Sequence, residues 1–479
     1  MNIKIIKYIL GLVLKLEGVL LLLPCLTALL YREKEGCAFL LVAAICVFIG
    51  HSMSYKRPQS QVFYAREGFI TVSLSWILLS FFGALPFCIS GEIPYFPDAL
   101  FEIVSGFTTT GASILDNVEA LSHCSIMWRS FTHWIGGMGV LVFILAILPM
   151  TGAHYMYLMK AESPGPSVEK LVPRVKKTAV ILYKIYAVLT ILQIILLCIT
   201  GMPVFDSLCI SFGTAGTGGF GITNTSCASY SPLQQVIITV FMIMFGVNFN
   251  IYYVLLLKKF RQAFHSEELR TYLAVIAIAI ALITYNIHEY YPSALTALRH
   301  AAFQVGSIIT TTGYTSYNYD LWPELSKTIL VILMFIGACA GSTGGGIKIS
   351  RILIMIKTVR KEVFSFSHPH GVKKIKMDGR AITHETVRSV NIFIISYLLI
   401  LAFSVLLISI DNYDFTTNFT AVAATLNNIG PGMNLVGASG NFGIYSVFSK
   451  FVLIFDMLVG RLEIFPLLVL FTPTAWRRN

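Results

Sequence analysis

The stretches Phe107-Thr-Thr-Thr-Gly111 and Ile309-Thr-Thr-Thr-Gly313 place the same tetrapeptide, Thr-Thr-Thr-Gly, at two distant points of a 479-residue chain. Two related stretches, Gly216-Thr-Gly-Gly219 and Asn427-Asn-Ile-Gly430, share the final glycine, and the four glycines follow one another at intervals of 108, 94 and 117 residues. Each stretch ends a short apolar segment that lies between two longer ones. This near-constant spacing indicates one ancestral unit copied four times.

The composition excludes a soluble globular protein. Hydrophobic residues make up 56% of the chain, charged residues only 12%, and the mean hydropathy is +0.75. Apolar windows long enough to cross a bilayer recur along the chain, including 8–30, 37–53, 67–90 and 179–200. The first window is too long for a signal peptide and has no small-residue cleavage site, so we interpret it as a retained helix. We therefore expect an all-α integral membrane protein.

The placement of basic residues predicts the topology. Of 35 Lys and Arg residues, 27 fall in six segments that alternate along the chain: Lys4–Lys7, Lys56–Arg66, Lys160–Lys184, Lys258–Arg270, Lys348–Arg388 and Arg477–Arg478. The intervening connections hold six: Arg32, Lys34, Arg129, Arg299, Lys327 and Lys450. By the positive-inside rule both termini are cytoplasmic, and we count ten spanning helices. The net charge of +11 is thus a topological signal and predicts no nucleic-acid partner.

The predicted fold has two leading helices followed by four helix–pore loop–helix repeats. The boundaries are 1–66 for the leading helices, then 67–160, 161–265, 266–380 and 381–479 for the repeats. Segments such as 98–107 and 293–308 are too short to span and fit re-entrant half-helices. Non-helical backbone at that depth must be buried in protein or line a water-filled path, which favours four loops meeting on one pseudo-fourfold axis. The alternative, four extracellular turns, does not explain why Thr-Thr-Thr-Gly occurs twice in equivalent places.

The Thr- and Gly-rich stretches have the composition of a cation filter. A desolvated monovalent cation needs a cage of oxygens, which extended backbone supplies through its carbonyl groups. Glycine permits the positive φ that keeps carbonyls facing one way, threonine adds a hydroxyl oxygen, and each short helix directs its partially negative end at the cavity. The predicted ligands are Thr109, Thr110, Gly111, Thr217, Gly218, Gly219, Thr311, Thr312, Gly313, Asn428, Ile429 and Gly430. We call these four triplets the Thr/Gly segments.

A second cluster of glycines interrupts what would otherwise be one long helix from 325 to 360. The glycine-rich segment consists of Gly341, Ser342, Thr343, Gly344, Gly345 and Gly346. Each glycine lowers helix stability by roughly 0.8–1 kcal/mol relative to alanine, so a stable helix is excluded there. We predict a mobile gate below the filter. The alternative is a close helix-packing motif of small residues.

Arg461 is a charge midway along the last apolar window. Such a residue is expensive in a bilayer and normally faces a water-filled cavity or a partner. Glu463 lies on another face of the helix and is a poor partner. The alternatives are a pairing with Asp456 or with loop carbonyls.

Several motifs, taken in order, resemble the Trk/Ktr/HKT superfamily of potassium transporters, and within it the bacterial TrkH type. They are Trp128-Arg-Ser-Phe-Thr-His-Trp-Ile-Gly-Gly-Met-Gly139, Leu148-Pro-Met150, Ser163-Pro-Gly-Pro166, the run from Gly341 to Lys348, and Gly460-Arg-Leu-Glu-Ile-Phe465. The resemblance covers essentially the whole chain. It implies potassium selectivity, because Gly at all four filter positions accompanies it in that superfamily. It also implies that Arg461 faces the pore and contacts the glycine-rich segment.

Two departures from fourfold symmetry stand out in the Thr/Gly segments. Gly218 occupies the place of Thr110 and Thr312, and the fourth segment carries Asn428 and Ile429. Fewer hydroxyl oxygens are therefore available than in a symmetric filter. His133 has no acidic or cysteine residue at metal-ligand spacing, which favours a packing role.

The predicted function is gated potassium uptake across the bacterial inner membrane, without enzymatic activity and with K⁺ as the transported ion rather than a covalent cofactor. The alternatives are a secondary cation symporter with alternating access, a sodium-permeable member of the same superfamily and, less compatible with the residues, a membrane-embedded enzyme. The resemblance implies a homodimer on a cytoplasmic nucleotide-binding regulatory subunit of the RCK type, similar to TrkA. Basic cytoplasmic segments are expected to contact anionic lipid.

Overall fold

The computed structural model describes residues 2–56, 58, 64–139, 175–368 and 374–476. The leading part holds α1 (Ile3–Leu20), α2 (Leu22–Tyr31) and α3 (Gly36–Ser54). Four groups follow. They are α4 (Ala65–Ser90), α5 (Phe96–Phe107) and α6 (His123–Gly137); α9 (Val175–Ile199), α10 (Val204–Gly216), α11 (Pro232–Phe245), α12 (Phe249–Leu256) and α13 (Phe260–Phe264); α14 (Glu267–Ile287), α15 (Ala294–Ile309), α16 (Glu324–Ile336) and α17 (Ile349–Ser367); and α18 (His384–Ile408), α19 (Phe415–Leu426), α20 (Val447–Arg461), α21 (Phe465–Leu470) and α22 (Pro473–Trp476).

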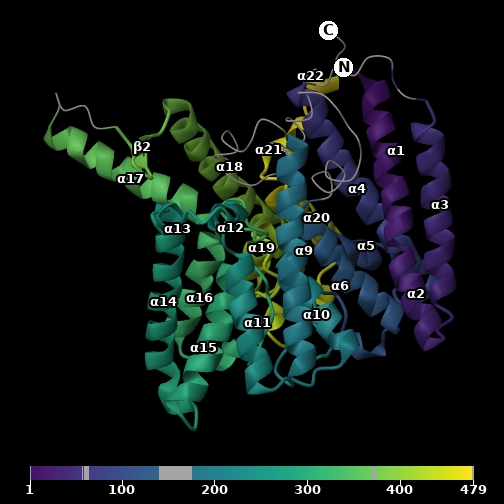
Figure 1. The fold of residues 1–479 in the computed structure, drawn as a ribbon, viewed down its shortest axis with the longest axis horizontal. Coiled ribbons are helices and arrows are strands. Elements are labelled where there is room, and N and C mark those ends of the chain that lie inside the picture. The colour runs from purple at the N-terminus through teal and green to yellow at the C-terminus, as the bar shows by residue number, and fades with distance from the viewer. Residues whose placement is uncertain (1, 57, 59–63, 140–174, 369–373, 477–479) are drawn as a thin grey trace.

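The remaining regular structure is minor. A two-stranded antiparallel sheet of β1 (Lys376–Met377) and β2 (Arg380–Ala381) follows α17. Short 3₁₀ turns lie in the connections at Val118–Ala120, His288–Tyr290, Tyr319–Leu321, Ser409–Asp411, Asn434–Val436 and Phe442–Ile444. The mostly helical prediction is confirmed. The start of α1 and the C-terminal α22 lie at the same end of the molecule, from which α17 projects sideways (Figure 1).

Six described helices or helix pairs are long and apolar enough to cross a membrane: Ile3–Tyr31, Gly36–Ser54, Arg66–Ser90, Ala179–Ile199, Glu267–Tyr290 and His384–Asp411. A seventh results if α11 and α12, which are bent by 90° relative to each other, count as one span. Many large apolar side chains on these helices are exposed, including Leu29, Leu30, Phe48 and Tyr285. A protein in water does not present so much apolar surface, so these faces fit contact with lipid.

The four short helices α5, α10, α15 and α19 begin and end where the sequence indicates. Ser293 begins α15 and Asp414 begins α19, each accepting a hydrogen bond from a backbone N–H of the first turn. Pro97 lies in the first turn of α5, where its missing N–H does no harm. The predicted segments 98–107 and 293–308 differ from the observed helices by one or two residues.

The four groups pack as a closed ring. Within each group the short helix contacts the helix before it and the helix after it. Between groups, α6 contacts α10, α11 contacts α15, α16 contacts α19, and α20 contacts α5. The helix that follows each short helix therefore packs on the short helix of the next group, and the fourth group returns to the first. This arrangement brings the four short helices around one axis.

The leading helices pack closely through small residues. A Cβ atom on Gly50 of α3 would lie 2.7 Å from the carbonyl oxygen of Gly11 of α1, and one on Gly11 would lie 2.8 Å from that of Gly50. Gly18 makes a similar approach to Ala43. Glycine lets two helices approach at backbone distance, which is how helices associate when lipid removes the hydrophobic driving force.

We expect Gly50→Val to destabilise the detergent-solubilised protein by about 1–3 kcal/mol, because the added side chain has no space between α1 and α3. The loss is measured as a lowered midpoint of thermal unfolding. Phe48→Val, on the exposed face of the same helix, is the control and should leave the midpoint unchanged. Equal midpoints for the two variants would contradict this packing.

Candidate functional site: a ring of four backbone segments

The Thr/Gly segments share one backbone conformation. Each begins one or two residues after a short helix ends, at Phe107, Gly216, Ile309 and Leu426. The first residue of each triplet has a left-handed φ of 54° (Thr109), 56° (Thr217), 59° (Thr311) or 55° (Asn428). The final glycines have φ values of 79°, 75°, 85° and 99° for Gly111, Gly219, Gly313 and Gly430. The middle residues do not share this conformation, so the chain alternates, and alternation turns successive carbonyls toward the same side.

The four segments touch one another in a closed cycle. A Cβ atom on any of the four glycines would lie within 3.0 Å of a backbone carbonyl oxygen of the neighbouring segment: Gly111 against Gly218, Gly219 against Thr312, Gly313 against Ile429, and Gly430 against Thr110. Real Cβ atoms do not approach so closely. Glycine is therefore required at these positions for two reasons. Its φ is positive, and the carbonyl oxygen of the neighbouring segment leaves no space for a side chain.

Most side-chain oxygens of the segments are used within the protein. The hydroxyls of Thr110 and Thr312 bond those of Thr108 and Thr310, at 2.8 and 2.7 Å between oxygens. The Thr217 hydroxyl donates to the carbonyl of Gly216 at 2.6 Å. Thr109 differs, because its hydroxyl is buried without a protein partner. The role of threonine hydroxyls as cation ligands stays a prediction, and among these hydroxyls that of Thr109 has no protein partner that would compete with a cation.

Asn428 anchors the fourth segment to its surroundings. Its Nδ2 donates to the Thr110 hydroxyl of the first segment at 3.0 Å and to the carbonyl of Met457 in α20 at 2.9 Å. The asparagine thus replaces a threonine hydroxyl with an amide that links three parts of the chain. This explains one departure from fourfold symmetry.

His133 explains the other departure. Its imidazole is fully buried and stacks on the Phe220 ring with centroids 4.3 Å apart. A Cβ atom on Gly218 would lie within 3.0 Å of this imidazole. The ring of His133 therefore occupies the place that a threonine side chain would need in the second segment. The predicted packing role of His133 agrees with this contact.

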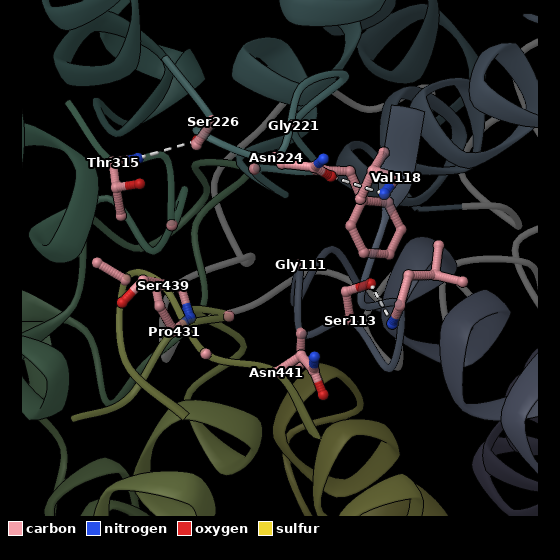
Figure 2. A pocket seen from close by; sticks show the side chains of 18 of the residues that line it. Gly111, Ser113, Val118, Gly221, Asn224, Ser226, Thr315, Pro431, Ser439 and Asn441 are labelled. Carbon is pink, nitrogen blue, oxygen red and sulfur yellow. Dashed lines mark hydrogen bonds between the residues drawn. The ribbon is translucent and has the colours of Figure 1, made fainter. Parts of the chain in front are cut away.

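A pocket opens on one side of the ring. All four final glycines line it, together with the residues that follow each of them, among them Ser113, Gly221, Thr315 and Pro431. Figure 2 shows these residues from all four groups around one opening, with Asn441 beside Ser113. Hydrogen bonds join neighbouring groups at its rim: Asn224 Oδ1 accepts from Val118 N at 2.8 Å, and Ser226 Oγ accepts from Thr315 N at 3.2 Å.

Arg129 is one of the residues that line this pocket. The sequence placed it in a connection between spans, which is wrong: it belongs to α6 and is only 1% exposed. It pairs with Glu102 of α5, with 2.6 Å between Nη2 and Oε1. Lys327 and Lys450 likewise lie in helices, α16 and α20, and Arg299 lies in α15, as the half-helix predicted at 293–308 implies.

The glycine-rich segment meets the opposite side of the ring. Gly345 N donates to the Thr311 hydroxyl at 2.6 Å, and Gly346 N donates to the Asn427 carbonyl at 3.0 Å. A Cβ atom on Gly344 would lie 2.8 Å from the carbonyl oxygen of Thr310. The interruption separates α16 from α17, as predicted, and places loop backbone directly against two of the four segments.

Two other described helices break near this loop, at the junctions of α11 with α12 and of α20 with α21, and α6 ends beside it, which the sequence reasoning missed. Two hydrogen bonds join the junction of α11 and α12 to the loop between α16 and α17. Cys339 N donates to the Gly246 carbonyl at 3.1 Å, and Phe249 N donates to the Gly341 carbonyl at 3.0 Å. At the junction of α20 and α21, Arg461 donates to the carbonyls of Gly136 and Gly137 at the end of α6. Glycines at or beside each junction, including Gly246 and Gly460, were the available signal, but isolated glycines also occur in ordinary helix packing.

Arg461 is the last residue of α20 and not the middle of a continuous helix. Its Nη1 donates to the Thr343 carbonyl at 2.9 Å, and its Nη2 donates to the carbonyls of Gly136 and, at 2.7 Å, Gly137. It therefore contacts the glycine-rich segment and the end of α6 together. Asp456 is not its partner in these contacts, because that carboxylate accepts from the Ser404 hydroxyl at 2.7 Å.

Two further charged residues border the glycine-rich segment and were not identified from sequence. Lys348 is 2% exposed and donates through Nζ to the Gly344 carbonyl. Arg351 of α17 pairs with Glu463, with 2.5 Å between Nη2 and Oε2. Both Glu463 and Ile464 have a left-handed φ, of 55° and 70°. The turn between α20 and α21 is therefore strained and held by the Arg351 pair.

The motifs at 148–150 and 163–166 lie outside the described residues. The other motifs of the predicted resemblance, at 128–139, 341–348 and 460–465, all contact the Thr/Gly segments or the residues next to them.

Comparisons with known proteins agree with this geometry. A family model for TrkH, described as cation transport protein, matches residues 35–477. The Trk system potassium uptake proteins TrkH of Salmonella typhimurium and Escherichia coli K12 are 39% and 38% identical to this chain, with all of each chain covered. The crystal structure of the potassium transporter TrkH from Vibrio parahaemolyticus superposes with a TM-score of 0.89 at 34% identity, with both chains fully covered. The chain therefore belongs to the TrkH family of cation transport proteins.

Proposed function

We propose that this chain takes up potassium across the bacterial inner membrane, with the four Thr/Gly segments as its selectivity filter. The observation that carries the proposal is the closed cycle of contacts in which each final glycine meets a carbonyl oxygen of the neighbouring segment. The cycle gathers backbone oxygens from four segments at one place, where they can replace the water of a monovalent cation. The names of the relatives, which are potassium uptake proteins, support the choice of K⁺.

The ion path runs from the pocket, through the ring, to the glycine-rich segment as gate. In this proposal Arg461 holds the gate shut, because its guanidinium bridges Thr343 of that segment and the end of α6 while adding positive charge below the filter. The proposed topology remains ten spans and four re-entrant half-helices, with the repeat boundaries at 67–160, 161–265, 266–380 and 381–479. The basic segments at the end where α1 begins and α22 ends support cytoplasmic termini.

The cytoplasmic end offers a place for partners. α17 projects from the helix bundle (Figure 1) and carries Lys357, Arg360 and Lys361 together with the exposed apolar residues Val359, Val363 and Phe366. We propose that it contacts a nucleotide-binding RCK-type subunit similar to TrkA, that the protein works as a homodimer, and that anionic lipid contacts the neighbouring basic segments. The name "Trk system" of the relatives supports a multi-component assembly.

The function is tested by growth of a bacterial strain without potassium uptake systems at micromolar potassium. Rescue by this chain, but not by an empty vector, supports uptake. Single-channel recording in a planar bilayer separates a pore from the alternative, a symporter with alternating access, since only a pore gives resolvable unitary currents. Equal permeability to sodium and potassium would identify a sodium-permeable member of the family instead.

We expect Gly111→Ser to increase the sodium to potassium permeability ratio by about tenfold, which corresponds to ~1.4 kcal/mol of lost discrimination. The added side chain collides with the carbonyl of Gly218 and is strained by the φ of 79°. Reversal potentials in mixed potassium and sodium measure the ratio. Gly201→Ser is the matched control, because Gly201 has a φ of 85° but open space around it. An unchanged ratio for Gly111→Ser would refute the filter assignment.

We expect Arg461→Ala, and deletion of Gly344–Gly346, to raise basal rubidium flux several-fold. The substitution removes the bonds to Thr343 and Gly137, and the deletion removes those from Gly345 and Gly346 to the ring. Rubidium uptake into vesicles is the measurement. Lys450→Ala, a cation at the other end of α20, is the control. Wild-type flux in both gate variants would mean that this segment does not close the path.

A further inference from the structure

The pair of Glu102 and Arg129 is a charged site that the proposed transport path does not use directly. Both side chains are almost completely buried, with exposures of 0% and 1%. Arg129 Nε and Nη2 both donate to Glu102 Oε1, at 2.8 and 2.6 Å. Burying two charges is unfavourable unless the geometry and the remaining hydrogen bonds compensate. A pair kept at this position therefore calls for a reason other than stability.

Glu102 holds the backbone that leaves the first Thr/Gly segment. Its Oε2 accepts from Ile114 N at 3.0 Å, and both of its oxygens accept from the Ser113 hydroxyl, at 3.0 and 3.1 Å. Ser113 lies two residues after the filter glycine Gly111. The carboxylate thus fixes where the chain goes immediately after it passes the ring.

Arg129 holds the corresponding part of the second segment. Its Nη1 donates to the carbonyl of Gly221 at 3.4 Å, two residues after Gly219. Its guanidinium also lies over the Phe220 ring, with 4.1 Å from Cζ to the centroid. Phe220 in turn stacks on His133, which packs against Gly218. One ion pair therefore supports two neighbouring segments of the ring.

The other repeats lack this pair at equivalent places. Nine residues before the final glycine, where the first repeat has Glu102, the others have Ile210, Gln304 and Ala421. Gln304 makes a neutral version of the contact, because its Nε2 donates to the Tyr317 carbonyl at 3.3 Å, four residues after Gly313. The seventh residue of the helix that follows each Thr/Gly segment is Arg129 in the first repeat, and Ile238, Leu330 and Leu453 in the others. The charged support belongs to the first repeat.

We propose that Glu102 and Arg129 are positioning residues of the filter, which fix the spacing of the first two Thr/Gly segments and thereby contribute to potassium over sodium discrimination. The inference rests on the proposed filter function and adds the residues that set its geometry. Arg129 also lines the pocket above the ring. Glu102 neutralises its charge there, so the mouth does not repel incoming cations.

The two roles make different predictions for different variants. Glu102→Gln leaves an unpaired guanidinium beside the pocket, so it should raise the sodium to potassium permeability ratio and also the potassium concentration for half-maximal flux. The double variant Glu102→Gln with Arg129→Gln restores neutrality, so the half-maximal concentration should return to the wild-type value while the permeability ratio stays raised. Arg129→Lys keeps the charge but loses the forked geometry, so it should raise the permeability ratio alone.

We expect the permeability ratio to rise by about tenfold in Glu102→Gln, and the half-maximal concentration by about threefold at low ionic strength with a smaller change in high salt, since salt screens the uncompensated charge. Reversal potentials and rubidium uptake in vesicles give the two quantities. The matched control is Asp98→Asn with Lys450→Gln, which removes an ion pair of 2.7 Å in the first turn of the same helix α5. It should change neither quantity.

The outcomes separate this inference from the proposed function. An unsubstituted protein without potassium preference would overturn the proposed function itself. A selective unsubstituted protein whose Arg129→Lys and double variants keep the wild-type permeability ratio would overturn only the positioning role. Should Glu102→Gln fail to yield folded protein, these two variants decide the question, because one preserves the charge and the other preserves neutrality.

Discussion

The approach of the final glycine of each Thr/Gly segment to a carbonyl oxygen of the neighbouring segment is the contact on which the rest of the structure depends. It leaves no space for a Cβ atom at Gly111, Gly219, Gly313 or Gly430. Non-helical backbone inside a membrane is tolerated only if protein or a water-filled path surrounds it. The four segments satisfy that condition for one another, and none could do so alone. This mutual dependence matches the closed ring of helix contacts around the four segments.

The ring also determines where the neighbouring helices must end. The helix after each short helix packs on the short helix of the next group. A continuous helix would carry its side chains into the space below the Thr/Gly segments. Instead, α11, α16 and α20 each end at that level. Hydrogen bonds to the carbonyls of Gly246, Gly341 and Thr343, the last of them donated by Arg461, join these helix ends to one another. The interruptions are one shared structure rather than separate irregularities.

Sequence reasoning found the features that are local or repeated. The period, the short helices predicted at 98–107 and 293–308 to within two residues, and the glycine interruption at 341–346 all follow from patterns along the chain. It failed where the outcome depends on partners far apart in sequence. Arg129 looked like a connection residue because Glu102, its partner 27 positions away, cannot be paired with it from spacing. Arg461 looked like the middle of a helix because hydropathy does not record a break. The cation that pairs with Glu463, Arg351, was not identified because it lies in another repeat.

The departures from fourfold symmetry follow from the same distinction between backbone and side chains. The backbone conformation is nearly identical in all four segments, because the ring contact constrains it directly. The side chains behind the segments are under no such common constraint and differ in each: a charged pair behind the first, the imidazole of His133 behind the second, Gln304 behind the third and the amide of Asn428 in the fourth. An amide, an imidazole and an ion pair differ in stiffness and in charge. Four Thr/Gly segments of the same backbone conformation are therefore held by four different side-chain contacts, and a change in one of these contacts can alter the spacing of the segments without a change in the segments themselves.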